Sequence, residues 1–146
     1  MKKIFTILAL TIVFNVNAQL APVTESGNTG QRLTTAVAAN HGDIGSNAVD
    51  LSYSPTASTT KGATGDFSTA IGYDTKAIGN LSTASGYAST ASGYASTAMG
   101  WYTTASGKYS TAMGNLTTAS DYGSLVIGQF NSSGSSVTSN ATSFDI

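Results

Sequence analysis

The middle of the chain follows a seven-residue pattern in which small, apolar and polar residues recur at fixed places. A glycine marks each repeat, at Gly65, Gly72, Gly79, Gly86, Gly93, Gly100, Gly107, Gly114 and Gly128. The pattern misses its glycine once, at Asp121. The residue two places before each of these positions is alanine, except at Val126. Such an internal repeat decides the architecture before any single residue is considered.

The true period is fourteen residues, because the residue just before each glycine alternates in character. One set is mostly apolar and consists of Ile71, Ser85, Met99, Met113 and Ile127. The other set is mostly polar and consists of Ile78, Ser92, Ser106 and Ser120. The stretch GYASTAMGWYTTAS, residues 93–106, is a representative unit.

The pattern within each half unit predicts a short β-strand rather than a helix. A helix would lose about 1 kcal/mol at every glycine, and no apolar seam of a coiled coil is present. Ser68 and Ala70 point to one side of an extended chain, whereas Thr69 and Ile71 point to the other. We expect the nine glycines to form tight corners with positive φ angles. Two strands and two corners give one coil, and stacked coils give an all-β, parallel β-solenoid.

Side-chain size predicts which face of each strand is inside. Alanine, serine and glycine can fill only a narrow, flattened roll, so we expect their face to form the interior. The apolar set would then form a stripe on the outside, and exposed apolar stripes usually have a partner. We therefore predict a self-association surface made of Ile71, Met99, Met113 and Ile127.

Two further outward sets are candidates for ligand contact. Thr90, Thr104 and Thr118 recur every fourteen residues and predict a column of hydroxyl groups on the opposite side of the roll. Tyr73, Tyr87 and Trp101 also recur every fourteen residues and predict an aromatic ladder along one corner. Tyr94 and Tyr122 would line the other corner, where Lys108 is expected to interrupt the ladder. Aromatic residues of this kind either pack against neighbouring protomers or bind protein or sugar ligands.

The repeat resembles the head domain of trimeric autotransporter adhesins, the YadA-like head, with its S-x-A-[IM]-G-x-x-[AST]-x-A pattern. The resemblance covers residues 65–128. It implies a homotrimer of left-handed parallel β-rolls, and the handedness comes from the resemblance alone. It also implies an adhesive role. Ser85 departs from the apolar stripe, so its coil should contribute least to the trimer.

Composition and charge narrow the range of functions. Only 9% of the 146 residues are charged and the formal net charge is −1, so there is no electrostatic case for binding nucleic acid or an anionic membrane. The absence of cysteine excludes disulfides, thiolate metal sites and a lipoprotein anchor. The strict repeat argues against disorder, despite the abundant serine, threonine and glycine.

The chain divides into four parts. Residues 1–18 have the basic start, short apolar run and small-residue end of a signal peptide, and the run is too short to span a membrane. Residues 19–60 are expected to form a leader and an irregular N-terminal cap, with a flexible stretch up to Arg32 and a capping strand at residues 48–53. Residues 61–130 are the head repeats, and residues 131–146 are a Ser/Asn-rich tail or linker.

No residue set predicts catalysis, a cofactor or a metal site. His41 and Asp43 form an incomplete pair, which loop hydrogen bonding explains. The sequence therefore predicts a non-enzymatic adhesin head, secreted or at the cell surface, or in the outer membrane if a longer chain carries the anchor. Its partners would be itself, as a homotrimer, and an extracellular-matrix or cell-surface protein or glycan. The alternatives are an ice- or crystal-binding solenoid and a tail-fibre-like segment, although a signal peptide speaks against the latter.

Overall fold

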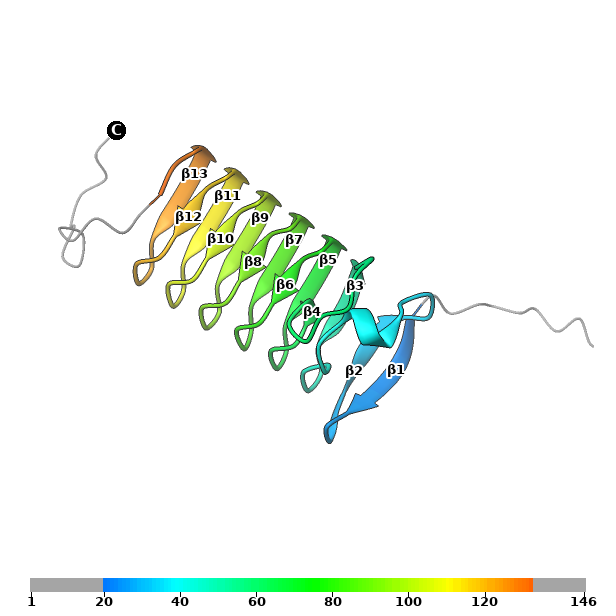
Figure 1. Cartoon of the computed structure of the whole chain (residues 1–146). Helices are drawn as coiled ribbons and strands as arrows, with labels where there is room; N and C mark the ends of the chain where they lie inside the picture. The colour runs from blue at the N-terminus through cyan, green and yellow to red at the C-terminus, as the bar shows by residue number, and fades with distance from the viewer. Residues whose placement is uncertain (1–19, 133–146) are drawn as a thin grey trace, which may run out of the picture.

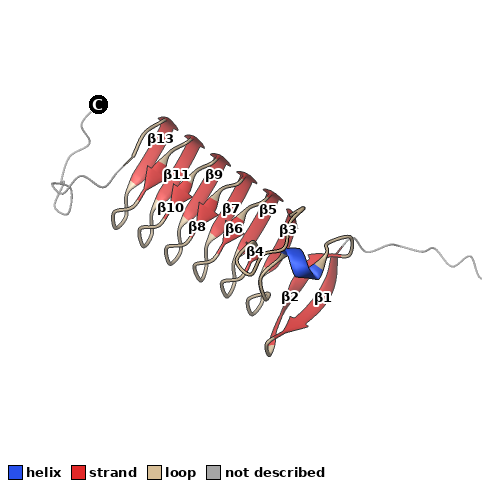
Figure 2. Cartoon of the chain, in the orientation of Figure 1, coloured by secondary structure: helices blue, strands red, loops and turns tan. Residues whose placement is uncertain are grey.

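The computed structural model describes residues 20–132, which form an elongated stack of coils with a hairpin at one end (Figure 1). The signal peptide and most of the predicted tail lie outside these residues. The described part is built from β-strands and one short 3-10 helix, η1 (Ala38–Asn40), as Figure 2 shows.

The strands belong to two sheets. The larger sheet has eight strands, which are β1 (Leu20–Glu25), β2 (Asn28–Leu33), β3 (Val49–Tyr53), β5 (Thr69–Tyr73), β7 (Thr83–Tyr87), β9 (Thr97–Trp101), β11 (Thr111–Asn115) and β13 (Leu125–Gln129). The smaller sheet has five strands, which are β4 (Gly62–Ala63), β6 (Lys76–Ala77), β8 (Thr90–Ala91), β10 (Thr104–Ala105) and β12 (Thr118–Ala119). From β3 onward the chain alternates between the two sheets, so each coil adds one strand to each wall of the roll.

Successive coils are stacked in parallel and in register. In the larger sheet Ala70 pairs with Ala84, and in the smaller sheet Ala77 pairs with Ala91, each fourteen residues further along the chain. The predicted all-β fold class, a parallel β-solenoid of fourteen-residue coils, is confirmed.

The interior of the roll is as narrow as the sequence predicts. Its apolar core is almost entirely alanine from both sheets. The repeat alanines, one every seven residues from Ala70 to Ala119, are fully buried. Serine and threonine fill the rest, and some of their hydroxyl groups donate to backbone carbonyls, as Ser96 does to Gly93 O at 2.8 Å and Ser110 to Gly107 O at 2.7 Å. These bonds offset the cost of burying the two hydroxyl groups.

The corners differ from the prediction, because glycine is not the residue that turns the chain. Left-handed residues stand two places after the repeat positions, at Phe67, Asp74, Leu81, Ala88, Ala95, Tyr102, Tyr109, Leu116, Gly123 and Phe130. Most of them are not glycine. In one corner the turn runs from Gly93 to Ser96, whose N–H donates to Gly93 O at 3.2 Å, and Ala95 has φ of 50°.

The glycines of the repeat form two columns with different roles. Gly72, Gly86, Gly100, Gly114 and Gly128 lie inside strands of the larger sheet and have φ angles from 109° to 132°. Gly65, Gly79, Gly93 and Gly107 do not have positive φ, so the predicted conformation is wrong for them. Asp121, which follows them in the same column, does not have positive φ either. Tolerance of left-handed geometry therefore does not explain the aspartate.

The N-terminal part is more regular than expected. The predicted flexible leader is wrong, because β1 and β2 form an antiparallel hairpin around Ser26 and Gly27, both with positive φ. β2 then pairs in parallel with β3, so a strand is present where one was expected at residues 48–53, but it is the hairpin that covers the end of the roll. β3 also pairs in parallel with β5, so the roll begins before residue 61, the expected start of the head repeats.

Candidate functional site

The outer face of the larger sheet brings together two of the predicted sets. Alternate residues of a strand point to the same side, so the first, third and fifth residues of β5 (Thr69, Ile71 and Tyr73) face outward around the buried Ala70. The parallel register repeats this arrangement in each coil. The face therefore carries three straight columns, one for each of these strand positions.

The middle column contains the predicted self-association residues. It runs through Leu51, Ile71, Ser85, Met99, Met113 and Ile127. The exposed fractions of Ile71, Met99 and Ile127 are 41%, 40% and 59%, so large apolar side chains lie open on a single chain. We call this set the apolar column.

The last column contains the predicted aromatic ladder, which stacks as expected but lies in the strands rather than along a corner. The ring centroids of Tyr73 and Tyr87 are 4.8 Å apart with planes 2° from parallel, and those of Tyr87 and Trp101 are 4.2 Å and 10°. Tyr53 extends the ladder, tilted at 5.8 Å from Tyr73. Partial desolvation by the neighbouring groups, together with Tyr102, raises the pKa of the half-buried Tyr87 above its ordinary value.

The hydroxyl column lies on the other wall of the roll. Thr90, Thr104 and Thr118 are in register and half-buried on the outer side of the smaller sheet. Lys76 takes the equivalent place in the preceding coil. The aromatic ladder and the threonine column therefore face opposite directions, and they cannot contact the same small ligand.

A second aromatic group occupies the corner that leads from the smaller sheet to the larger one. Tyr109 packs edge-on between Tyr94 and Tyr122, with ring centroids 5.7 Å and 5.4 Å away. Lys108 does not interrupt the group, because its Nζ lies 5.2 Å from the Tyr94 ring and 5.3 Å from the Tyr109 ring. The sequence analysis missed Tyr109 because it is one residue out of phase with the other two tyrosines.

His41 pairs with a different aspartate from the one the sequence suggests. His41 Nδ1 is 2.9 Å from Asp50 Oδ2, which also receives Arg32 Nε at 3.3 Å. Arg32 makes a second ion pair with Glu25 at 2.7 Å. Burial acts to raise the pKa of Asp50, but the hydrogen bonds from His41 and Ser52 outweigh it and hold the pKa below its ordinary value. This buried group ties the hairpin to the first coil.

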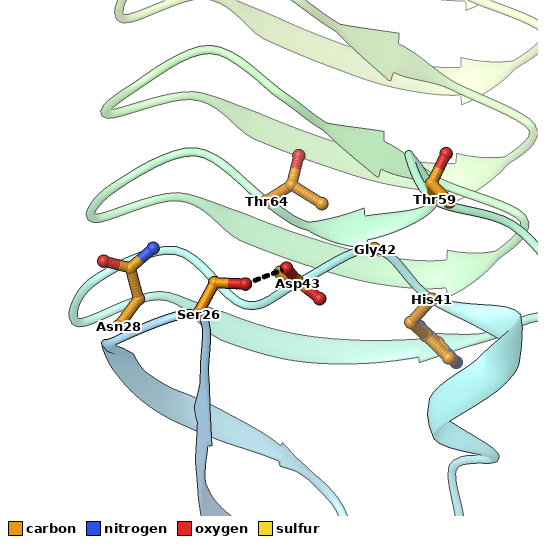
Figure 3. Close-up of a pocket in the computed structure, with 7 residues that line it drawn as sticks. All are labelled: Ser26, Asn28, His41, Gly42, Asp43, Thr59 and Thr64. Carbon is orange, nitrogen blue, oxygen red and sulfur yellow. Dashed lines mark hydrogen bonds between the residues drawn. The ribbon is translucent and has the colours of Figure 1, made fainter.

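Asp43 instead lines a shallow polar pocket of about 370 Å³ near the hairpin (Figure 3). Figure 3 shows Ser26 and Asp43 pointing toward each other, with the Ser26 hydroxyl donating to Asp43 Oδ2, while the His41 ring points away. Within residues 20–132 there is no group of three or more His, Cys, Asp or Glu residues that could hold a metal ion. The same residues contain no helix long and apolar enough to cross a membrane.

Comparison with known proteins identifies the repeat. The family model described as the YadA head domain repeat (2 copies) matches residues 63–80, 77–103 and 105–131. No curated protein and no solved structure matches the chain. The matched residues span β4 to β13, which is the regular part of the roll and includes the apolar column from Ile71, the aromatic ladder from Tyr73 and the threonine column.

Proposed function

We propose that the chain is the non-enzymatic head of a trimeric, surface-exposed adhesin, because its coils match the YadA head domain repeat between residues 63 and 131. The observation that carries the proposal is the family match over the whole regular roll. The partners we propose are two further copies of the chain and an extracellular-matrix or cell-surface protein or glycan. Attachment through many repeated contacts would then be avid even if each contact is weak.

The narrow core supports the trimer. Each buried methyl group of the alanine core contributes about 0.8 kcal/mol, whereas ordering the backbone of one residue costs about 1–2 kcal/mol. A roll filled with alanine and hydroxyl groups therefore gains from burying a second apolar surface. We propose that the trimer interface is centred on Ile71, Met99, Met113 and Ile127, because they form the one straight column of large apolar side chains in the matched coils. Ser85, which lies in β7 between Ile71 and Met99 in this column, would weaken the interface there.

The ligand would meet the surfaces that remain open once this column is covered. The smaller sheet forms the opposite wall, so Thr90, Thr104 and Thr118 would face outward from the trimer. The ladder of Tyr73, Tyr87 and Trp101 lies beside the apolar column, where its outer side would remain accessible. Stacked tyrosine and tryptophan side chains offer a large contact area at low entropic cost.

Two measurements test this proposal. Light scattering of the purified chain should give three times the monomer mass, and a folded, stable monomer would contradict the trimer. The chain should also bind surfaces coated with matrix proteins or intact cells. Changing Tyr87 and Trp101 together to alanine should weaken this binding while the trimer mass is kept. The matched control changes Tyr94 and Tyr122 to alanine, which removes two rings from the corner group and should bind as the unchanged chain does.

An ice- or crystal-binding role is favoured by one observation, the in-register column of Thr90, Thr104 and Thr118. With about 4.8 Å between strands, these three rungs span only about 10 Å. In a trimer the three columns would also face different directions. We therefore expect no thermal hysteresis in a freezing assay. Ice-crystal shaping that disappears in Thr104→Tyr would reverse this ranking.

A further inference from the structure

Neither glycine column of the roll has room for a side chain, and the column that begins at Gly45 lacks positive φ angles as well. A Cβ atom built on Gly45, Gly65, Gly79, Gly93 or Gly107 would lie 2.1–2.3 Å from the carbonyl oxygen of the next residue in the column. The obstacle is backbone, so it cannot rotate away as a side chain would. We call these five glycines, together with Asp121, the corner column.

A side chain in the corner column would separate two coils. Moving the carbonyl oxygen from 2.1 Å to 3.0 Å, the shortest separation that real Cβ atoms show, shifts the next coil by about 0.9 Å. At Gly93 the contact lies beside two inter-coil bonds, from Ser92 N and Gly93 N to Ala105 O, at 2.9 Å and 3.2 Å. A shift of this size would stretch both bonds to about 4 Å, which is beyond hydrogen-bonding distance.

Asp121 is the one member of the corner column that has a side chain. It is in register with the coil before it, because its carbonyl oxygen is the atom that a Cβ on Gly107 would strike, at 2.1 Å. It also makes the same turn as the glycines, since Ser124 N donates to Asp121 O at 3.2 Å just as Ser110 N donates to Gly107 O at 3.1 Å. Its Cβ must therefore point along the stack, as the Cβ built on Gly107 does.

We infer that Asp121 sets the length of the roll, because its Cβ occupies the place that the carbonyl oxygen of a further coil in register would need. The rest of the pattern continues past this residue. Gly128 and the left-handed Phe130 keep their places, and Thr118 forms a parallel bridge with Ser132. Asp121 is therefore the first residue of the corner column whose side chain stands where a further coil in register would have to lie. The Cβ of Asp121 would clash equally with a coil from the same chain and with one from a second copy. It therefore also hinders end-to-end association of two chains through the edge strand β13.

The test inserts one additional coil on either side of Asp121 in the full chain. The inserted sequence is a copy of residues 107–120, GKYSTAMGNLTTAS. Placed after Ser120, the copy precedes Asp121 and is followed by an unaltered end. Placed after Gly134, it puts its own first glycine fourteen residues beyond Asp121, in the next position of the corner column. Hydrogen exchange of the amides in the inserted strand then reports whether the coil has stacked.

We expect the copy placed after Ser120 to exchange as slowly as β11, and the copy placed after Gly134 to exchange at the rate of an unstructured peptide. Adding Asp121→Gly to the second insertion should restore slow exchange, whereas adding Asp121→Ala should not, because alanine keeps the Cβ. Slow exchange of the copy placed after Gly134, with Asp121 unchanged, would overturn the inference. Fast exchange of this copy in the presence of Asp121→Gly, or slow exchange in the presence of Asp121→Ala, would also overturn it, because the cause would then not be the Cβ.

Discussion

The corner column can be tested by adding a single methyl group in the middle of the roll. Gly93→Ala places a Cβ 2.1 Å from Gly107 O and 2.6 Å from Gly107 C. Gly93 does not have positive φ, so the change introduces no left-handed strain and acts through its contacts with the next coil, which also include Ser106 O at 2.9 Å.

The expected loss of stability has two parts, the strain of overpacking and the hydrogen bonds to the neighbouring coil that are stretched. Overpacking by one methyl group typically costs about 1–3 kcal/mol. The two hydrogen bonds to Ala105 O that would be stretched contribute about 1 kcal/mol each. We therefore expect Gly93→Ala to lower the free energy of unfolding by about 2–4 kcal/mol, because part of the strain is relieved when the bonds lengthen.

Urea denaturation followed by circular dichroism, at one fixed chain concentration, measures this loss. Gly123→Ala is the matched control, because it adds the same methyl group in the same type of turn but with no atom within 4 Å of the Cβ. Its φ of 65° should cost only about 1 kcal/mol. Equal unfolding midpoints for Gly93→Ala and the unchanged chain would refute the stacking of the corner column, and so would a larger loss in Gly123→Ala.

Three further changes test other parts of the molecule. Met113→Asp should reduce the mass in light scattering from trimer to monomer, because it places a charge in the apolar column, whereas Ser106→Asp on the opposite wall should keep the trimer mass. Ala95→Gly should raise the free energy of unfolding by about 0.5–1 kcal/mol, because it relieves a left-handed alanine with φ of 50°. Asp50→Asn should destabilise the chain at neutral pH, with a difference from the unchanged chain that shrinks in acid denaturation. The folded pKa of Asp50 lies below the ordinary 3.8, so its ionised form stabilises the chain above that pH and the contribution is lost as the pH falls through the folded pKa.

The repeat could be predicted from the sequence because a two-residue alternation and a fourteen-residue period leave few architectures. Ala70 and its equivalents are small at every repeat, and only a narrow interior explains that. The role of the glycines could not be predicted in the same way. A glycine in a turn suggests an unusual φ angle, which is a local property, whereas the obstacle at Gly93 is a carbonyl fourteen residues away. That contact exists only after the coils are stacked.

The hairpin and the buried ion pairs were missed for a related reason. Arg32 looked like the end of a leader, but it reaches Asp50 and Glu25 because β2 lies beside β3. No repeat connects these residues, so their separations of eighteen and seven residues carry no signal. The Ser26-Gly27 dipeptide, which is a turn signal between two short stretches, is the sequence feature that could have indicated a hairpin.

The shared face of the larger sheet limits how the aromatic ladder can serve a trimer. The third and fifth residues of a strand are about 7 Å apart, so Tyr87 and Trp101 stand one side-chain width from the apolar column. Their ring faces already cover one another at 4.2 Å, which leaves mainly ring edges for other contacts. If three chains pack through the apolar column, the edges nearest that column meet a neighbouring protomer and those on the far side face solvent. Trp101 is half exposed and Asn115 follows it in the column, so we expect the ladder's outward contact to centre on Trp101.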